Sequence, residues 1–254
     1  MSVLADGLRL AAGTLTVIPV PPPRRVSGAE AAVAMVVAPI AVLPVAAAAA
    51  ATAWGGDLLA LPPLVVATVT VAVLGLATGG LHLDGLADTV DGFATHGTTA
   101  RRLEVMRRGD LGPSGAAALL LVLAVQVGAL SALVAQGSSP LAVFLAVVVS
   151  RAVLAPACLR GLAAARADGL GSTVVGAVPV LAAALVVCLT AVVVIVLVGP
   201  HGLVGFAVAL VAVGAVLLVS RRKLGGSTGD VLGACVEIAF AAYLVTQVGE
   251  LPAL

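Results

Sequence analysis

The sequence has few charged and few aromatic residues. Only 10% of its 254 residues are charged and 2% are aromatic, whereas 61% are hydrophobic. Soluble domains carry about 25% charged residues, so this composition excludes that class. The net charge of +1 offers no basic surface, and we expect no nucleic-acid partner. The shortage of aromatic residues also predicts sparse aromatic belts at a membrane interface.

Cysteine is scarce as well, and we do not expect the N-terminal residues to form a signal peptide. Cys158, Cys188 and Cys235 lie far apart in or beside apolar segments, without CxxC spacing. This pattern predicts small buried apolar side chains and indicates neither a disulfide nor a zinc site. The N-terminus lacks a positively charged start and a clear cleavage site. We expect residues 2–16 to form a short amphipathic helix lying at the membrane interface.

Long apolar runs dominate what is present. Lipid offers backbone amides no partners, so these runs must be helical, with about 20 residues needed to cross the hydrocarbon core. The sequence therefore predicts an all-α, polytopic transmembrane helical bundle of about seven spans, within a range of six to eight. We expect one integral membrane domain over 1–254, with spans at 31–53, 63–82, 115–136, 139–159, 173–198, 201–220 and 230–249.

The basic residues fall in alternate loops. All except Arg151 lie in the N-terminal segment or after the second, fourth and sixth spans. The positive-inside rule places those segments in the cytoplasm and the C-terminus outside. We therefore expect a multi-pass protein of the plasma membrane with its active site on the cytoplasmic face. The segment 83–114 is expected to be a cytoplasmic loop that carries part of that site.

An acidic cluster follows the second apolar run. Asp84, Asp88 and Asp91 are spaced i, i+4, i+7, so on a helix they would share one face. Close carboxylates repel one another unless a cation neutralises them, and oxygen-only ligands favour Mg²⁺. We predict that all three bind magnesium and are catalytic, and that His82 is a general base or a hydrogen-bond partner of the substrate. The alternative is a solvated helix end carrying surface carboxylates.

Arginines gather after this cluster, at Arg101, Arg102, Arg107 and Arg108. Guanidinium groups bind phosphates through paired, charge-assisted hydrogen bonds. We predict that Arg101, Arg102 and Arg107 bind substrate. The alternative is a topology signal in contact with anionic lipid.

A glycine-rich segment, 225–234, precedes and enters the last apolar run. A helix that starts in such a loop offers free N–H groups and a positive dipole end to an anion. We predict substrate binding by Gly226, Thr228 and Gly229, with Asp230 as a further magnesium ligand. The alternative is that Thr228 and Asp230 only cap the helix.

Two charged residues lie within apolar runs. Arg151 is inside the fourth expected span, and Glu237 lies two turns beyond Asp230. Charges at such depth are costly and indicate function by default. Arg151 could pair with Glu237 or an aspartate, or extend its side chain to the interface.

Together and in this order, the motifs resemble the cobalamin synthase family, the adenosylcobinamide-GDP ribazoletransferases. The similar segments are 15–21, 80–92, 102–106, 165–171 and 225–234. The resemblance implies a transferase that joins adenosylcobinamide-GDP to α-ribazole or its 5′-phosphate, with Mg²⁺ as cofactor. GMP would be released, and adenosylcobalamin or its phosphate formed. The implied setting is the bacterial plasma (inner) membrane, with the lipid bilayer as partner and a homo-oligomer left open.

Two other classes of protein compete with this interpretation. Membrane phosphotransferases of the CDP-alcohol type also use aspartate-rich helices, but their Asp-Gly pair is followed by Ala-Arg. Here Asp84-Gly85 is followed by Leu86-Ala87-Asp88. Prenyltransferases need a second aspartate-rich motif, which is not evident. In a cation- or proton-coupled transporter, Asp230, Glu237 and Arg151 could line an ion path. Such a protein would favour acidic residues near mid-membrane and an internal repeat, whereas here the acidic residues cluster at one face and no convincing repeat is seen.

Overall fold

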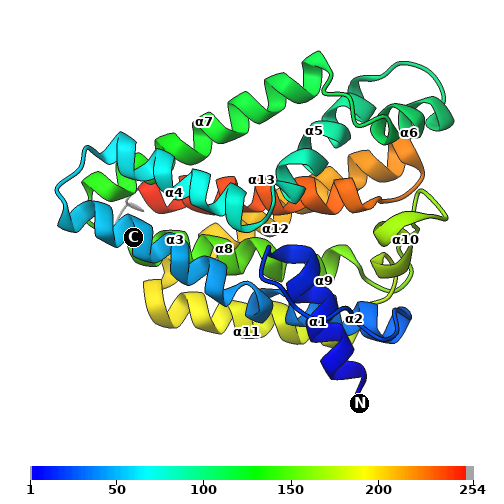
Figure 1. Cartoon of the computed structure of the whole chain (residues 1–254), viewed down its shortest axis with the longest axis horizontal. Helices are drawn as coiled ribbons and strands as arrows, with labels where there is room; N and C mark the ends of the chain where they lie inside the picture. The colour runs from blue at the N-terminus through cyan, green and yellow to red at the C-terminus, as the bar shows by residue number, and fades with distance from the viewer. Residues whose placement is uncertain (1, 250–254) are drawn as a thin grey trace.

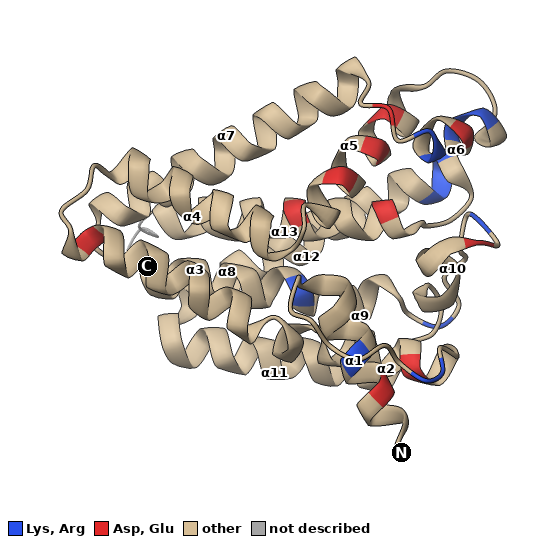
Figure 2. Ribbon diagram, viewed as in Figure 1, with Lys and Arg blue, Asp and Glu red and all other residues tan. Residues whose placement is uncertain are grey.

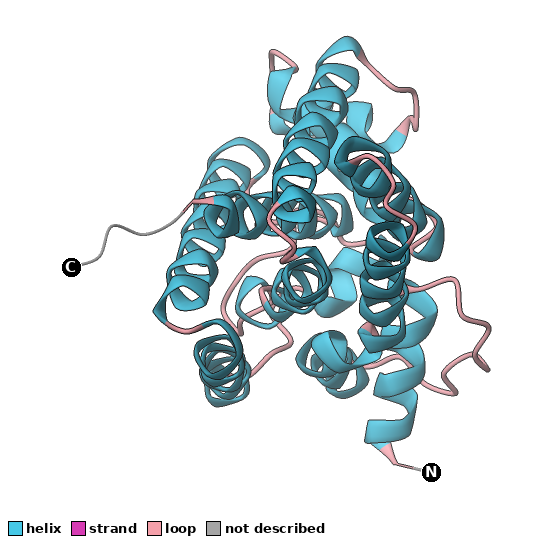
Figure 3. Cartoon of the chain, turned by 90° about the vertical axis from the view of Figure 1, so that its left-hand side faces the viewer, coloured by secondary structure: helices cyan, strands magenta, loops and turns pink. Residues whose placement is uncertain are grey.

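The computed structural model describes residues 2–249, which form a bundle of helices without strands (Figure 1). The helices are α1 (Val3–Leu15), α2 (Gly28–Ala41), α3 (Leu43–Leu58), α4 (Pro63–Ala77), α5 (Leu81–Ala94), α6 (Thr99–Arg107), α7 (Pro113–Ala135), α8 (Ser139–Ala152), α9 (Leu154–Ala157), α10 (Gly169–Val174), α11 (Val180–Val198), α12 (Pro200–Leu224) and α13 (Gly229–Val248). The view along the bundle shows the long helices nearly end-on (Figure 3). Helix α13 is central, because it packs against α5, α7, α8 and α12.

Within residues 2–249, six helical segments are long and apolar enough to cross a membrane. They are Gly28–Leu58, Pro113–Ala135, Ser139–Ala157, Val180–Val198, Pro200–Leu224 and Gly229–Val248. Helices α4 and α5 pass the same test only as a pair, bent by 90°, which would give a seventh span. The predicted all-α polytopic membrane bundle is thereby confirmed.

The second expected span, 63–82, is interrupted. Helix α4 ends at Ala77, and α5 starts at Leu81 in a new direction. Gly79 and Gly80 both adopt positive φ values, 62° and 71°, which glycine accepts without steric cost. Helix α5 has fourteen residues, three of them aspartates, and is too short and polar to cross a bilayer alone.

Other boundaries also differ from the expectation. The segment 83–114 is not a simple loop, since it contains most of α5 and all of α6. Thr98 starts α6 by accepting a hydrogen bond from the backbone N–H of Arg101. The fifth expected span begins later than residue 173, because α10 ends at Val174 and α11 starts only after Pro179. The expected N-terminal helix is present as α1, packed against α2.

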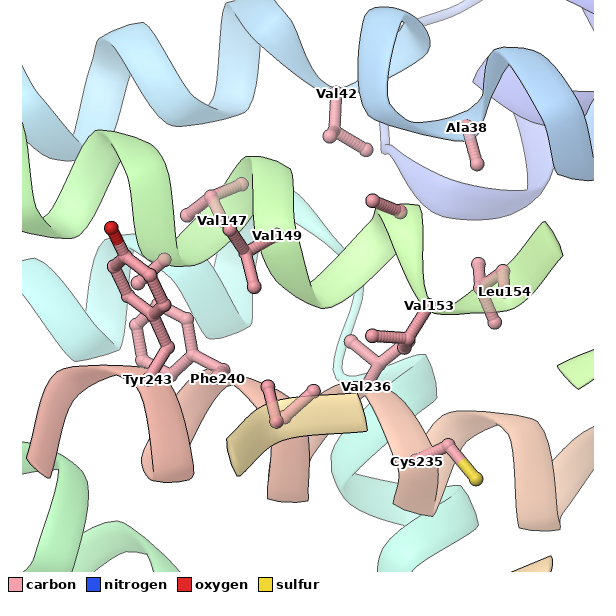
Figure 4. Packing of buried hydrophobic residues seen from close by; sticks show 14 of the residues in the cluster. Ala38, Val42, Val147, Val149, Val153, Leu154, Cys235, Val236, Phe240 and Tyr243 are labelled. Atoms are coloured by element: carbon pink, nitrogen blue, oxygen red, sulfur yellow. The ribbon is translucent and has the colours of Figure 1, made fainter. Parts of the chain in front are cut away.

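Small and β-branched side chains fill the core. Within α2 and α3, six alanines are fully buried, namely Ala31, Ala34, Ala38, Ala46, Ala49 and Ala53. Figure 4 shows valines of α8 between the α2–α3 segment and the aromatic rings of Phe240 and Tyr243 on α13. In lipid, helices associate mainly through close packing, which small side chains permit.

A buried polar group lies in this core. Gln126 of α7 donates a hydrogen bond of 2.7 Å from Nε2 to Oε2 of Glu237. Gln126, Glu237 and Arg151 all line a small cavity of about 20 Å³. The guanidinium of Arg151, however, donates to the Ser150 hydroxyl at 2.8 Å. Among residues 2–249, Arg151 therefore forms no ion pair with Glu237 or an aspartate, and it stays buried instead of reaching the interface.

We expect Gln126→Leu to lower the free energy of unfolding by about 1–3 kcal/mol, because Glu237 would lose a buried donor. Gln136→Leu is the matched control, since Gln136 is exposed and bonds only to the Val248 carbonyl. Thermal or denaturant unfolding in detergent measures both. Equal unfolding midpoints for the two variants would contradict a stabilising role for the buried bond.

Candidate active site

Charged residues gather toward one end of the bundle, around α5, α6 and the start of α13 (Figure 2). A cavity of about 440 Å³ lies among these elements and α1, α2, α9 and α10. Of the predicted site residues, His82, Asp84, Arg107, Thr228, Gly229 and Asp230 line this cavity. The other predicted site residues do not line this cavity.

Two glycines set the distance between the acidic helix α5 and α13. A Cβ atom on Gly85 would come within 2.8 Å of the Asp230 carbonyl oxygen. A Cβ atom on Gly233 would come within 3.3 Å of the backbone of His82. The two helices therefore touch backbone to backbone, which brings Asp84 and Asp88 beside Asp230.

This crowding changes the acidity of Asp88. Burial, followed by the neighbouring carboxylates of Asp84, Asp230 and Asp91, raises the pKa of Asp88 to about 6. The guanidinium of Arg166 opposes them. The expected repulsion between like charges is thus present, with a single nearby cation acting against it.

Asp91 lies on the same helix but is bonded elsewhere. Its two carboxylate oxygens accept hydrogen bonds of 2.8 Å from the backbone N–H groups of Gly112 and Gly115. Side chains on either glycine would overlap this carboxylate. Asp91 therefore fastens α5 to the start of α7, which is an N-terminal capping arrangement.

The four aspartates predicted as ligands do not form a ready-made metal cage. Across residues 2–249, no group of three or more His, Cys, Asp or Glu side chains is arranged to hold a metal ion. Asp84 and Asp88 sit one turn apart on α5, with Asp230 nearby on α13, and Asp91 is turned to α7. Asp84 and Asp88 therefore form a pair of neighbouring carboxylates, with the carboxylate of Asp230 beside them.

Asp230 is already paired with a cation. It accepts hydrogen bonds from the guanidinium of Arg166 and, at 3.1 Å, from the hydroxyl of Thr228. The same hydroxyl accepts from the N–H of Val231, so Thr228 is the N-cap of α13. The capping alternative is therefore observed for Thr228, on a residue that also lines the cavity.

Backbone pairing holds Arg166 in place. The Ala165 N–H donates to the Ser227 carbonyl at 2.8 Å, and the Ser227 N–H donates to the Ala163 carbonyl at 2.9 Å. Gly226 permits this approach, because any side chain there would overlap the Ala163 carbonyl. Gly226 does not line the cavity, and its part is to allow the backbone pairing that positions Arg166.

His82 is buried in the cavity wall without a protein partner. The residue is 3% exposed, and neither ring nitrogen has a hydrogen-bond partner among residues 2–249. An unpaired polar group in such a place is costly. Both nitrogens are also closed off from solvent, so His82 contributes buried, unpaired polar atoms behind the cavity surface.

The predicted arginines separate into two groups. Arg107 lines the cavity and pairs with Asp168 at 2.8 Å. Arg102 instead donates to the Gly92 and Phe93 carbonyls at the end of α5. Arg101 pairs with Glu104 at 2.8 Å. Neither Arg101 nor Arg102 lines the cavity.

Sequence reasoning missed several cavity residues. Arg166 and Asp168 lie in the segment 165–171, whose polar, glycine-rich pattern was the available signal. The buried apolar lining comes from Leu15, Met35, Leu154, Val174 and Leu232. Nothing in the sequence distinguishes these residues from the rest of the core.

Comparison with known proteins adds independent evidence. A family model described as Cobalamin-5-phosphate synthase matches residues 7–248. An adenosylcobinamide-GDP ribazoletransferase of a Nocardioides species is 42% identical over 242 residues, covering 95% of this chain and 98% of the relative. The proteins of the same name from Frankia casuarinae and Escherichia coli K12 are 36% and 38% identical. They cover 96% and 76% of this chain, and the match spans 95% and 76% of their own lengths.

No solved structure matches the chain. The family match extends over nearly all of the described helices, including α5, α6, α10 and α13 around the cavity. The chain therefore belongs to the cobalamin-5-phosphate synthase family.

Proposed function

We propose that this protein joins adenosylcobinamide-GDP to α-ribazole or its 5′-phosphate and releases GMP, at the last stage of cobalamin synthesis. The observation that carries the proposal is the cavity where α5 meets α13, since the family-typical segments 80–92, 165–171 and 225–234 all contribute to it. The relatives are adenosylcobinamide-GDP ribazoletransferases, and this activity indicates the two substrates.

In this reaction an acceptor oxygen attacks the phosphorus next to the cobinamide. The bond from that phosphorus to the bridging oxygen breaks, and GMP leaves with the bridging oxygen. Arg107 and Arg166 both line the cavity, and guanidinium groups there can bind the pyrophosphate and the departing GMP. Each is held by a carboxylate, Asp168 or Asp230, with which the substrate phosphates would compete.

The carboxylates fit magnesium in one of its usual modes. Mg²⁺ commonly binds proteins through one or two carboxylates together with substrate phosphates, and needs no all-protein cage. Asp84 and Asp88 would hold it, with Asp230 as a third candidate ligand. When bound, the ion would neutralise charge that develops on the pyrophosphate. Asp91 is better suited to fixing the helix, because both of its oxygens are occupied.

Two cavity residues can take the proton of an attacking hydroxyl. Asp84 is exposed and lies on the cavity wall beside the proposed metal ligands. His82 is the second candidate, but both of its ring nitrogens are buried and unpaired within residues 2–249, so its imidazole would have to turn toward the cavity to take this proton.

We also propose the plasma membrane as location, with the cavity on the cytoplasmic face. Arg107 and Arg166 line the cavity, and the last turn of α12, just before the loop that leads into α13, carries Arg221, Arg222 and Lys223. Basic residues next to spans favour the cytoplasmic side.

We expect the purified protein in nanodiscs to convert adenosylcobinamide-GDP and α-ribazole into a cobamide and GMP when Mg²⁺ is present. Asp84→Asn and Asp88→Asn should each lower kcat by about a hundredfold, because each removes charge that supports the transition state. Chromatography of cobamide and GMP measures turnover. Asp110→Asn is the control, since Asp110 is exposed and does not line the cavity. Near-normal turnover in both α5 variants would refute the assigned site.

Arg107→Gln and Arg166→Gln should raise the KM for adenosylcobinamide-GDP by about tenfold or more, because each removes a charged hydrogen bond to phosphate. Steady-state kinetics at saturating α-ribazole give this KM. Arg101→Gln provides the comparison, because Arg101 bonds to Glu104 away from the cavity. A rise in KM for Arg101→Gln alone would reverse the assignment.

Asp91→Asn should lower the free energy of unfolding by about 1–3 kcal/mol, since an amide cannot accept from both backbone N–H groups. Asp84→Asn should not, because it relieves repulsion between like charges. Unfolding midpoints in detergent compare the two. If Asp91→Asn left the midpoint unchanged while removing Mg²⁺ dependence, Asp91 would be a ligand after all.

A further inference from the structure

A second, smaller cavity lies where α7, α8 and α13 meet the bend between α4 and α5. Its volume is about 20 Å³, and it is lined by Gln126 of α7, Arg151 of α8 and Glu237 of α13. Gly75 of α4 and Leu83 of α5 also line it, one on each side of the bend. None of these residues lines the candidate active site, so this cavity has to be explained separately.

Arg151 is deeply buried and has few hydrogen-bond partners. The residue is 3% exposed, and the one hydrogen bond of its guanidinium within residues 2–249 goes from Nη1 to the Ser150 hydroxyl at 2.8 Å. Its Nε atom is enclosed by protein without a partner in that range, so only the terminal nitrogens remain to bond into the cavity. A guanidinium has five N–H donors, and leaving most of them unpaired in a membrane bundle is costly. The group therefore needs a partner in the cavity.

Glu237 has one carboxylate oxygen that makes no hydrogen bond. Its Oε2 accepts from Gln126 Nε2 at 2.7 Å, whereas Oε1 has no hydrogen bond within residues 2–249. The described residues contain no ion pair between Glu237 and Arg151, although both line the cavity. Opposite charges that are held apart in a protein core are both desolvated and uncompensated. A molecule between them must therefore accept a hydrogen bond from the guanidinium and donate one to the carboxylate.

Size and charge together identify this molecule. A cavity must offer about 10–15 Å³ to hold a water molecule, so about 20 Å³ accommodates one water and little more. An anion would be repelled by Glu237 and a cation by Arg151, whereas water both accepts and donates hydrogen bonds. We propose that the cavity binds one water molecule, which accepts a hydrogen bond from Arg151 and donates one to Glu237. The water completes an ion pair that joins α8 to α13 beside the α4–α5 bend.

Filling the cavity with a methyl group tests for the water. A Cβ atom on Gly75 would meet Leu83 Cδ1 at 3.7 Å, an ordinary contact, so alanine fits at this cavity-lining position. With the water bound, Gly75→Ala displaces it, and the unfolding midpoint in detergent should fall by about 3 °C, because buried charged groups lose their partner. In a dry cavity the same change would raise the midpoint by about 2–4 °C, because alanine favours a helix more than glycine does.

Gly128→Ala on α7 is the matched control. Its Cβ atom would meet nothing within 4 Å, and Gly128 does not line the cavity, so the midpoint of this variant should rise by about 2–4 °C. A rise of the same size in Gly75→Ala would overturn the bound water.

Solid-state NMR of the protein in lipid detects the water directly. In protein made with isotope-labelled arginine, the guanidinium signal that disappears in Arg151→Met belongs to Arg151. That signal should receive magnetisation from water in the wild type and in Gly128→Ala, and it should lose most of this transfer in Gly75→Ala. No transfer in the wild type would contradict the proposal.

A double-mutant comparison tests whether the two charges act as a pair. Arg151→Met and Glu237→Gln each leave one buried charge uncompensated, and each should lower the midpoint by about 10 °C. The double variant removes both charges and keeps an acceptor for Gln126, so its midpoint should lie above that of either single variant. Additive losses would refute the bridged pair. None of these measurements uses a substrate, so their outcome is independent of the proposed function.

Discussion

The site depends on one backbone contact, between α5 and α13. Gly85 and Gly233 remove the side chains that would otherwise separate these helices, since a Cβ on Gly85 would meet the Asp230 carbonyl at 2.8 Å. Only at this separation do carboxylates from two distant parts of the chain face one cavity. The turn at Gly79 and Gly80 makes the contact accessible, because it directs α5 away from the axis of α4.

Repulsion between the closely packed carboxylates then determines which groups surround the contact between α5 and α13. The carboxylates are stabilised in different ways. Asp91 accepts from two backbone N–H groups and Asp230 pairs with Arg166, whereas Asp84 and Asp88 have no hydrogen-bond or ion-pair partner within residues 2–249. The two without partners are the ones free to share a cation with a phosphate. Arg166 pairs with Asp230, and its guanidinium could bind a substrate phosphate once that phosphate replaces the Asp230 carboxylate.

The sequence predicted the fold class and the acidic helix face, because apolar run length and i, i+4, i+7 spacing are local properties. It could not predict that Asp91 turns to Gly112 and Gly115, since that contact joins residues over twenty positions apart. The break in the second span was hidden because hydropathy continues through it. Arg102 and Arg107 look alike in sequence, yet one caps α5 and the other lines the cavity.

The apolar lining shows why such a site must be read from the structure. Met35 and Leu154 are indistinguishable in sequence from other core residues. Only the fold shows that these two line the cavity. In an aqueous protein an apolar hollow beside charges would be costly to keep dry. In a bundle already surrounded by lipid, apolar walls are the default, and the specialised feature of this cavity is the set of charged side chains on its wall, Asp84, Arg107, Arg166, Asp168 and Asp230.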